Sequence, residues 1–138
     1  MASSLKRYEA YSISKKFLVY GQMLREPKVL NAIPEIDFKW YRSWGKSFYD
    51  VSMSAVLSSA WKAPDNSLGI VLYNIDNKEH EVSILLNDSS YGLSKEKRYD
   101  IKPFYPKNCE SNFEQKDGNI IFKCKIPAQS PAVFEISE

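Results

Sequence analysis

Histidine is the scarcest of the chemically versatile residues in this sequence, because His80 is the single one among 138 residues. Catalytic Ser-His and Cys-His pairs need a base within hydrogen-bond reach of the nucleophile, so one histidine beside a turn gives little support to nucleophilic catalysis. Acidic residues are plentiful, but Asp65, Asp76 and Asp117 fall in turn sequences, where they usually stabilise the turn. The sequence therefore predicts no catalytic residues and a protein that is not an enzyme.

Cysteine and glycine are also sparse. Cys109 and Cys124 are too far apart in the sequence for a C-x-x-C redox or zinc motif, and the five glycines are isolated, so they form no phosphate-binding loop. We expect no metal and no cofactor. A hairpin at residues 117–118 would bring the two cysteines together, which makes a disulfide one alternative. We favour two small packing residues, because nothing else indicates an oxidising compartment.

Neither charge nor hydrophobicity is concentrated in one region. The 19 basic and 17 acidic residues are scattered, whereas binding to nucleic acid needs a dense basic stripe. The longest mainly apolar stretches, such as residues 68–73, are far shorter than the roughly 20 residues of a membrane-spanning helix. The first residues lack the order of a secretion signal. We expect a cytoplasmic protein without nucleic-acid or membrane partners, unless the chain is a fragment of a secreted protein.

Hydrophobic residues make up 43% of the chain, which is enough for one hydrophobic core. The length of 138 residues is that of a single domain. Residues 1–26 are predicted to form an N-terminal helix. It would begin at Ser4 as N-cap and end by Arg25, since Pro27 disfavours helical geometry at the preceding residue. Its apolar face is predicted from residues that recur at spacings of four, three and four, namely Ile13, Phe17, Tyr20 and Leu24.

Residues 51–138 show short runs of β-branched and aromatic residues that are separated by polar turns, as is typical of antiparallel strands. Because no helical pattern lies between these runs, the predicted fold class is mainly β: an antiparallel β-sandwich of about seven strands, preceded by one N-terminal helix. The strands are predicted at residues 54–61, 68–73, 80–86, 99–105, 113–115, 120–125 and 132–136. The predicted core includes Trp61, Ile70, Leu72, Ile84, Ile121 and Phe134.

Residues 27–50 form an aromatic-rich connection to which the sequence assigns no secondary structure. Its rings, with Trp40, Tyr41 and Trp44 at the centre, have two interpretations. They could stack against sugar rings, as aromatic residues do in carbohydrate-binding sandwiches, or they could fill a core or an interface between domains. We favour the second interpretation, because large aromatic residues dominate cores and interfaces generally.

Two segments resemble a known family. Residues 55–78 contain a strand that ends in Trp61, a turn with Asp65 and a strand that ends in Asn74, and residues 126–136 approach the last strand through prolines. This order resembles the C-terminal β-sandwich of large TIM-barrel glycoside hydrolases, and residues 17–24 resemble the last barrel helix and the exit from it. In such enzymes the catalytic carboxylates lie on the barrel, which this sequence lacks, so the resemblance implies no catalytic residue here.

The resemblance implies a non-catalytic accessory domain that packs against and stabilises a catalytic barrel. The alternative is a free-standing carbohydrate-binding module. Sugar or partner contacts are predicted at Tyr20, Leu24, Trp40, Tyr41 and Trp44. The partner would be a barrel domain or a second copy of the chain. We expect Tyr20, Leu24, Trp40 and Trp44 to form one apolar patch, which either folds back on the sandwich or is buried in a symmetric dimer; of the two, we expect the dimer.

Overall fold

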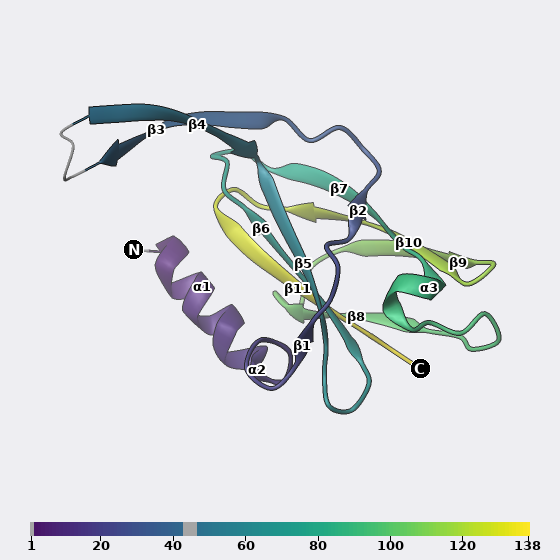
Figure 1. Ribbon diagram of the computed structural model, residues 1–138. Helices are drawn as coiled ribbons and strands as arrows, with labels where there is room; N and C mark the ends of the chain where they lie inside the picture. Colours follow the sequence, from purple (N-terminus) through teal and green to yellow (C-terminus); the bar gives the residue numbers. More distant parts are fainter. Residues whose placement is uncertain (1, 43–46) are drawn as a thin grey trace.

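Two antiparallel sheets face each other in the computed structural model (Figure 1). The structure describes residues 2–42 and 47–138. The side chains of residues 2–4, 41, 42, 47, 88 and 89 lie outside that description. The elements in chain order are α1 (Ala2–Ile13), α2 (Lys15–Leu18), β1 (Gln22–Met23), β2 (Lys28–Val29), β3 (Glu35–Arg42), β4 (Ser47–Ser54), β5 (Val56–Lys62), β6 (Leu68–Asn74), β7 (His80–Leu86), α3 (Asp88–Tyr91), β8 (Asp100–Tyr105), β9 (Ser111–Lys116), β10 (Asn119–Ile126) and β11 (Ser130–Ser137).

One sheet has five strands in the order β1-β5-β6-β11-β8, and the other has four in the order β2-β7-β10-β9. Every strand pair in them is antiparallel. The seven strands predicted from residues 54–136 correspond to β5 through β11, and β7 covers the predicted residues 80–86. The mainly β fold with one preceding helical segment is therefore confirmed.

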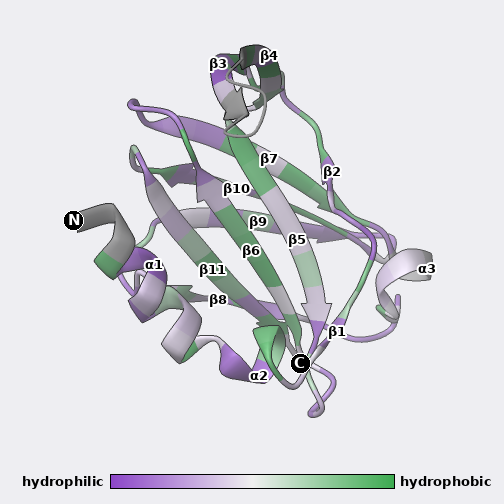
Figure 2. Cartoon of the chain, turned by 60° about the vertical axis from the view of Figure 1, so that its left-hand side comes forward, coloured by the Kyte–Doolittle hydropathy of each residue, from purple (hydrophilic) through white to green (hydrophobic). Residues whose placement is uncertain are grey.

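The core lies between the two sheets and follows the alternation of side chains along each strand. On β6, Ile70 and Leu72 are fully buried, and Figure 2 shows long hydrophobic stretches on β6 and β11. Phe122 on β10 packs on Phe134 on β11, with ring centroids 5.4 Å apart. The prediction for Ile121 is wrong, because β10 turns its even-numbered residues inward and leaves Ile121 half-buried. Trp61 is also half-buried, and its indole N–H donates to Ser59 Oγ at 2.9 Å.

The N-terminal helices cover the outer face of the five-stranded sheet. Phe17 of α2 is fully buried there, and its ring lies directly on Gly69 of β6. A Cβ atom at position 69 would lie 2.5 Å from that ring, so this close approach requires glycine. The helix α1 packs along β11, which explains why Val133 is buried although it points away from the space between the sheets. Strand β11 is thus buried on both faces.

The single helix predicted to run from Ser4 to Arg25 is not what the structure contains. The helix α1 begins before Ser4, which is therefore not the N-cap, and α2 ends at Leu18. Beyond it, β1 pairs with the edge of β5, and the backbone N–H of Leu24 donates to the carbonyl of Ala60 at 2.8 Å. The open edge of the sheet supplies partners that end the helical geometry, because an unpaired strand edge attracts another strand.

The aromatic-rich connection, left without secondary structure by the sequence, contains most of a β-hairpin. Strands β3 and β4 pair with each other from Glu35↔Ser54 to Arg42↔Ser47. In the described chain neither strand joins either sheet of the sandwich. The hairpin projects from one end of the molecule, while α2 lies at the opposite end in both views (Figures 1 and 2).

Candidate functional site

His80, the only histidine, stabilises a turn. The ring Nε2 of His80 lies 2.7 Å from Asp76 Oδ2, and both side chains are mostly buried. The hydrogen bond with His80 holds the pKa of Asp76 below its ordinary value. Asp76 also accepts a hydrogen bond from the backbone N–H of Asn77 at 2.7 Å. The pair therefore closes the turn between β6 and β7, which is a structural use of both groups.

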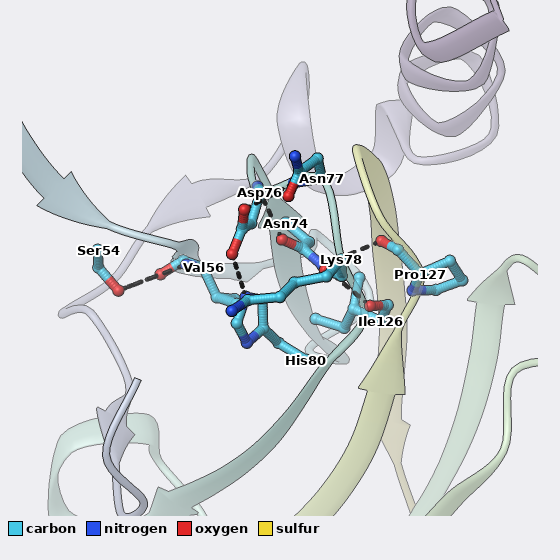
Figure 3. Close-up of polar contacts among 9 residues, drawn as sticks. All are labelled: Ser54, Val56, Asn74, Asp76, Asn77, Lys78, His80, Ile126 and Pro127. Atoms are coloured by element: carbon cyan, nitrogen blue, oxygen red, sulfur yellow. Dashed lines mark hydrogen bonds and ion pairs between the residues drawn. The ribbon is translucent and has the colours of Figure 1, made fainter. Parts of the chain in front are cut away.

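Asn74 ties the same turn to the other sheet. Its side-chain Nδ2 donates to the carbonyls of Lys78, Ile126 and Pro127 at 2.8, 3.0 and 3.1 Å. Its Oδ1 accepts from the backbone N–H of Asp76 at 2.9 Å. Figure 3 shows this amide between the turn and the end of β10. Because Asn74 is fully buried, the amide satisfies backbone groups that water cannot reach.

A cluster of three charged residues, Lys16, Asp65 and Glu135, links α2 to the five-stranded sheet. Lys16 of α2 forms ion pairs with Glu135 on β11 and, at 3.0 Å, with Asp65 in the turn between β5 and β6. Burial lowers the pKa of Lys16, but the hydrogen bonds with Glu135 and Asp65 outweigh it, so the pKa lies above its ordinary value. The ammonium also lies 5.0 Å from the ring centroid of Phe17. This cluster holds the position of α2 rather than a ligand.

We expect Asp65 to make the stability depend on acid pH. The Ser67 hydroxyl, which donates to Asp65 Oδ1 at 2.5 Å, the Ser67 backbone N–H and Lys16 lower the pKa of Asp65 from 3.8 to about 2. A lowered carboxyl pKa stabilises the fold fully above about pH 4, and this stabilisation is lost as the pH falls through about 2. Asp65 is 59% exposed, so the effect is small.

The measurement is the urea midpoint of unfolding at about pH 5 and about pH 2, for the wild type and for Asp65→Asn. The wild-type midpoint should fall more between the two pH values than that of the variant. Asn keeps an oxygen that accepts from Ser67, so the comparison isolates the charge. Equal falls in both proteins would contradict the assignment.

Both cysteines are free thiols. Cys124 is buried on β10, and Cys109 is half-buried beside the core. Burial raises the pKa of Cys124 to about 12, so its thiol stays protonated. This agrees with the interpretation as packing residues. Among the described residues, His, Cys, Asp and Glu side chains do not gather in any group of three or more that could bind a metal ion.

An open polar cleft of about 510 Å³ lies at the end of the sandwich near the C-terminus. Its polar groups already serve the fold: the Tyr91 hydroxyl donates to the carbonyl of Arg25 at 2.9 Å, and the Tyr99 hydroxyl accepts from the backbone N–H of Ser94 at 2.8 Å. Lys97 is paired with Glu138 at 2.6 Å. The cleft therefore offers few convergent groups to a ligand.

The structure separates the residues that the sequence predicted as one contact surface. Tyr20 follows α2 and is 71% exposed, whereas Leu24 is half-buried against the core. Trp40 lies on the hairpin at the other end of the molecule and is 56% exposed. Tyr41 belongs to β3, but its side chain lies outside the described residues, as does all of Trp44. Tyr20 and Trp40, two of the four residues that we expected in one apolar patch, therefore lie on two separate surfaces.

The first surface was largely missed by the sequence analysis. Large apolar side chains that are at least 43% exposed concentrate on α1, on β1 and on the two residues that follow α2. We call the following seven residues the N-terminal apolar surface: Leu5, Tyr8, Tyr11, Ile13, Val19, Tyr20 and Met23. In residues 55–138, by contrast, Leu57 and Phe113 are the comparable side chains among those described. The signal was present in the sequence, because Leu5, Tyr8 and Tyr11 recur on the side of α1 away from the buried Ala10 and Ser14.

Two facing antiparallel sheets with the core between them define a two-layer β-sandwich domain. The model of the glycosyl hydrolase family 30 beta sandwich domain matches residues 47–132, from β4 into β11. The chain belongs to this family, which confirms the resemblance to the sandwich of barrel glycoside hydrolases. Comparison with curated proteins and with solved structures gives no match. Within the described part of the chain, no helix is long and apolar enough to cross a membrane.

Proposed function

We propose that the chain is a non-catalytic accessory domain that packs against a catalytic barrel and stabilises it. The observation that carries this proposal is the N-terminal apolar surface. Tyr8 and Tyr20 are 68% and 71% exposed, and their neighbours add further apolar area on the same elements. A concentration of exposed apolar side chains on one segment of the chain favours an interaction site there, because exposing apolar area to water is unfavourable. Membership of a glycosyl hydrolase family makes a barrel domain the partner of first choice.

The inner side of α1 shows why the outer side needs another explanation. Ala10 and Ser14 are buried against the sheet together with Phe17 of α2, so the helix is already anchored by small residues and one ring. Leu5 and Tyr8 contribute little to that contact, since they are 59% and 68% exposed. A surface helix usually carries polar residues on the side opposite its buried side, so the exposed apolar residues of α1 need another explanation.

The test is binding of the full chain to family 30 catalytic barrels from the same genome, expressed as separate chains. Calorimetry should show a one-to-one complex, and the double variant Tyr8→Ser/Tyr20→Ser should bind at least about tenfold more weakly, as loss of interface aromatics usually causes. The control is Phe113→Ser, which removes a 41% exposed ring from β9 on the far sheet and should leave the affinity unchanged. Equal affinity of the wild type and the double variant would contradict the proposal.

We expect the purified chain to show no glycosidase activity. Glycoside hydrolysis needs two carboxyl groups that flank the bond, one of which acts as acid. In the barrel glycoside hydrolases that the chain resembles, this pair lies on the barrel, and on the sandwich Asp65 is engaged by Lys16 and Ser67 and Asp76 by His80. Assays with aryl glycosides should therefore give no turnover above the buffer rate. Turnover that disappears when one carboxylate of this chain is mutated would overturn the expectation.

A carbohydrate-binding module is the second candidate, because Trp40 presents an indole that is 56% exposed. Exposed indoles offer flat apolar faces on which sugar rings can stack. Titration with oligosaccharides of the family's substrate classes is the test. Saturable binding that is lost in Trp40→Ala or in Trp44→Ala would favour this candidate over the accessory role.

A further inference from the structure

Cys109 and Cys124 lie close together at the edge of the four-stranded sheet. Cys124 is on β10, and the register pairs it with Ser111, the first residue of β9. Cys109 precedes Ser111 by two positions, and its Sγ donates to the carbonyl of Lys125 at 3.8 Å. Lys125 directly follows Cys124, so this contact places the Cys109 thiol next to the segment of β10 that carries the other thiol.

Both thiols contact the core, but they differ in their access to water. Cys124 is on the inward, even-numbered side of β10 and is buried. Cys109 packs against the same core cluster and is half-buried. Neither of them is in a disulfide. The pair therefore combines one accessible thiol with one sheltered thiol.

The surroundings keep both groups protonated. The charged side chains that line a small cavity beside Cys124 are Glu81, Glu110, Lys123 and Lys125. Burial raises the pKa of Cys109, and Glu110 adds to this. Burial also raises the pKa of Cys124 to about 12, with smaller contributions from Cys109 and Glu81. Both groups are therefore thiols at neutral pH, and their reaction with an oxidant becomes faster as the pH rises.

We propose that Cys109 and Cys124 form a modification site, at which a low-molecular-weight disulfide of the glutathione type joins them reversibly in a disulfide bond. In the reduced chain they are the packing residues described above. The sequence left a disulfide between them as an alternative, and the contact of Cys109 with β10 gives that alternative a structural basis. The proposal is independent of the role of the N-terminal apolar surface.

The reaction consists of two thiol–disulfide exchanges. Cys109 loses its proton to water, and its thiolate attacks one sulfur of oxidised glutathione and displaces a glutathione thiolate. The Cys124 thiolate, formed in the same way, then attacks Cys109 Sγ in the mixed disulfide and displaces the second glutathione. The displaced thiolates take up protons. The protein loses two S–H bonds and gains one S–S bond, while the S–S bond of oxidised glutathione is reduced to two thiols.

The bond requires a small movement of residues 106–110. Continued by two positions, the register of β9 and β10 would place Cys109 diagonally from Cys124, at about 7–8 Å between Cα atoms, whereas a disulfide takes at most about 7 Å. Cys109 lies outside β9, and its backbone N–H donates to the carbonyl of Pro106 in its own turn at 3.1 Å. The turn therefore moves toward β10 without the loss of a paired position of the two strands.

The bond holds the edge strand β9 on the sheet. In the described chain β9 pairs with β10 alone. Toward its other end, the Gln115 side chain donates to the carbonyl of Lys97 at 2.6 Å and accepts from the backbone N–H of Tyr99 at 3.1 Å. The bond secures the beginning of the strand. It also closes residues 109–124 into a loop, which restricts the unfolded chain and lowers the equilibrium constant of unfolding by about tenfold to a hundredfold.

The experiment exposes the folded full chain to oxidised glutathione at about pH 8, where more of the thiol is ionised than at neutral pH. After free thiols are blocked by alkylation, mass spectrometry should show a chain that has lost two hydrogen atoms and a peptide pair that links Cys109 to Cys124. The urea midpoint of unfolding should rise on oxidation and return to its original value after reduction with dithiothreitol.

Two variants separate the roles of the thiols. Cys124→Ala should stop at a mixed disulfide between Cys109 and one glutathione, because the second exchange has no thiol. Cys109→Ala should stay reduced, because Cys124 is buried. Oxidised glutathione should raise the urea midpoint of neither variant. A rise in Cys109→Ala would show that the stabilisation has another cause and would overturn the proposal.

A second control treats the wild-type chain with the same reagent in concentrated urea, where both thiols are exposed. A bond that forms in urea but not in the folded chain would show that the fold keeps the thiols apart, which overturns the proposal. A folded wild type that stops at the mixed disulfide, or that links two chains through Cys109, would overturn it as well. An oxidised chain whose midpoint does not exceed that of the reduced chain would contradict the stabilisation of β9.

Discussion

Replacement of Phe134 by alanine is expected to lower the free energy of unfolding by about 3–5 kcal/mol, the range for truncating a large buried aromatic residue. Phe134 is fully buried on β11, the strand covered by the other sheet on one side and by the helices on the other. Its ring packs on Phe122 across the core, so the truncation leaves a cavity between the two sheets rather than a dent in the surface. Denaturant unfolding of the purified variant measures the loss.

The matched control is Phe113→Ala. This phenylalanine lies on β9, directly opposite Phe122, but is 41% exposed. Its loss should cost less than about 1 kcal/mol, the scale of a cross-strand contact at a surface. A loss below about 0.5 kcal/mol for Phe134→Ala would place this residue outside the core and contradict the assignment of β11.

The strands of the sandwich could be predicted because each strand has at least one buried face, which requires apolar residues at regular positions along it. Val82, Ile84 and Leu86 on β7 are buried at every second position, which is the period that the sequence shows. On β10 the same rule favours the even-numbered side, because Ile121 shares its side with Lys123 and Lys125, so the prediction of a buried Ile121 did not follow the alternation. The packing of Phe122 on Phe134 shows the even-numbered side to be the inner one, and Phe134 lies on β11, the next strand along the chain but in the other sheet.

The hairpin could have been found from the sequence. Ile36, Phe38 and Trp40 alternate with Glu35, Asp37 and Lys39, which is a strand pattern. The adjacent aromatic pairs at 40–41 and 48–49 obscured this period. Strands β1 and β2, with two residues each, show no period at all. They form because their backbone groups meet the edges of β5 and β7.

The separation of the two exposed surfaces could not be read from the sequence. Tyr20 and Trp40 are 20 positions apart, and nothing in the pattern between them says how the chain turns. The structure shows that residues 22–29 run along the edges of both sheets before the hairpin begins, which carries Trp40 to the far end of the molecule. Which side of α1 is exposed likewise depends on a contact between distant residues. Phe17 of α2, the helix that follows α1, packs over Gly69 of β6 and so fixes both helices on the sheet.

Replacement of Asn74 by alanine is expected to lower the free energy of unfolding by about 2–4 kcal/mol. The change removes one buried amide and leaves the carbonyls of Ile126 and Pro127, more than 50 residues away, without their side-chain donor. A buried polar group without a partner costs about 1–3 kcal/mol, and here more than one group loses its partner. The measurement is again denaturant unfolding. The control is Asn77→Ala, because Asn77 is an exposed neighbour in the same turn, and its free energy of unfolding should stay within about 0.5 kcal/mol of the wild type.

A second variant, Asn74→Asp, distinguishes the hydrogen bonds from simple loss of volume. Aspartate keeps the oxygen that accepts from the backbone N–H of Asp76, but it replaces the donor Nδ2 by an acceptor that faces three carbonyl oxygens. Its shape is nearly that of asparagine, so a packing role alone would leave the stability close to that of the wild type. We expect Asn74→Asp at pH 7 to be destabilised at least as much as Asn74→Ala, because a buried carboxylate beside carbonyl oxygens is repelled and desolvated. Unfolding near the wild-type midpoint would instead show that the amide donors contribute little to joining the turn to β10.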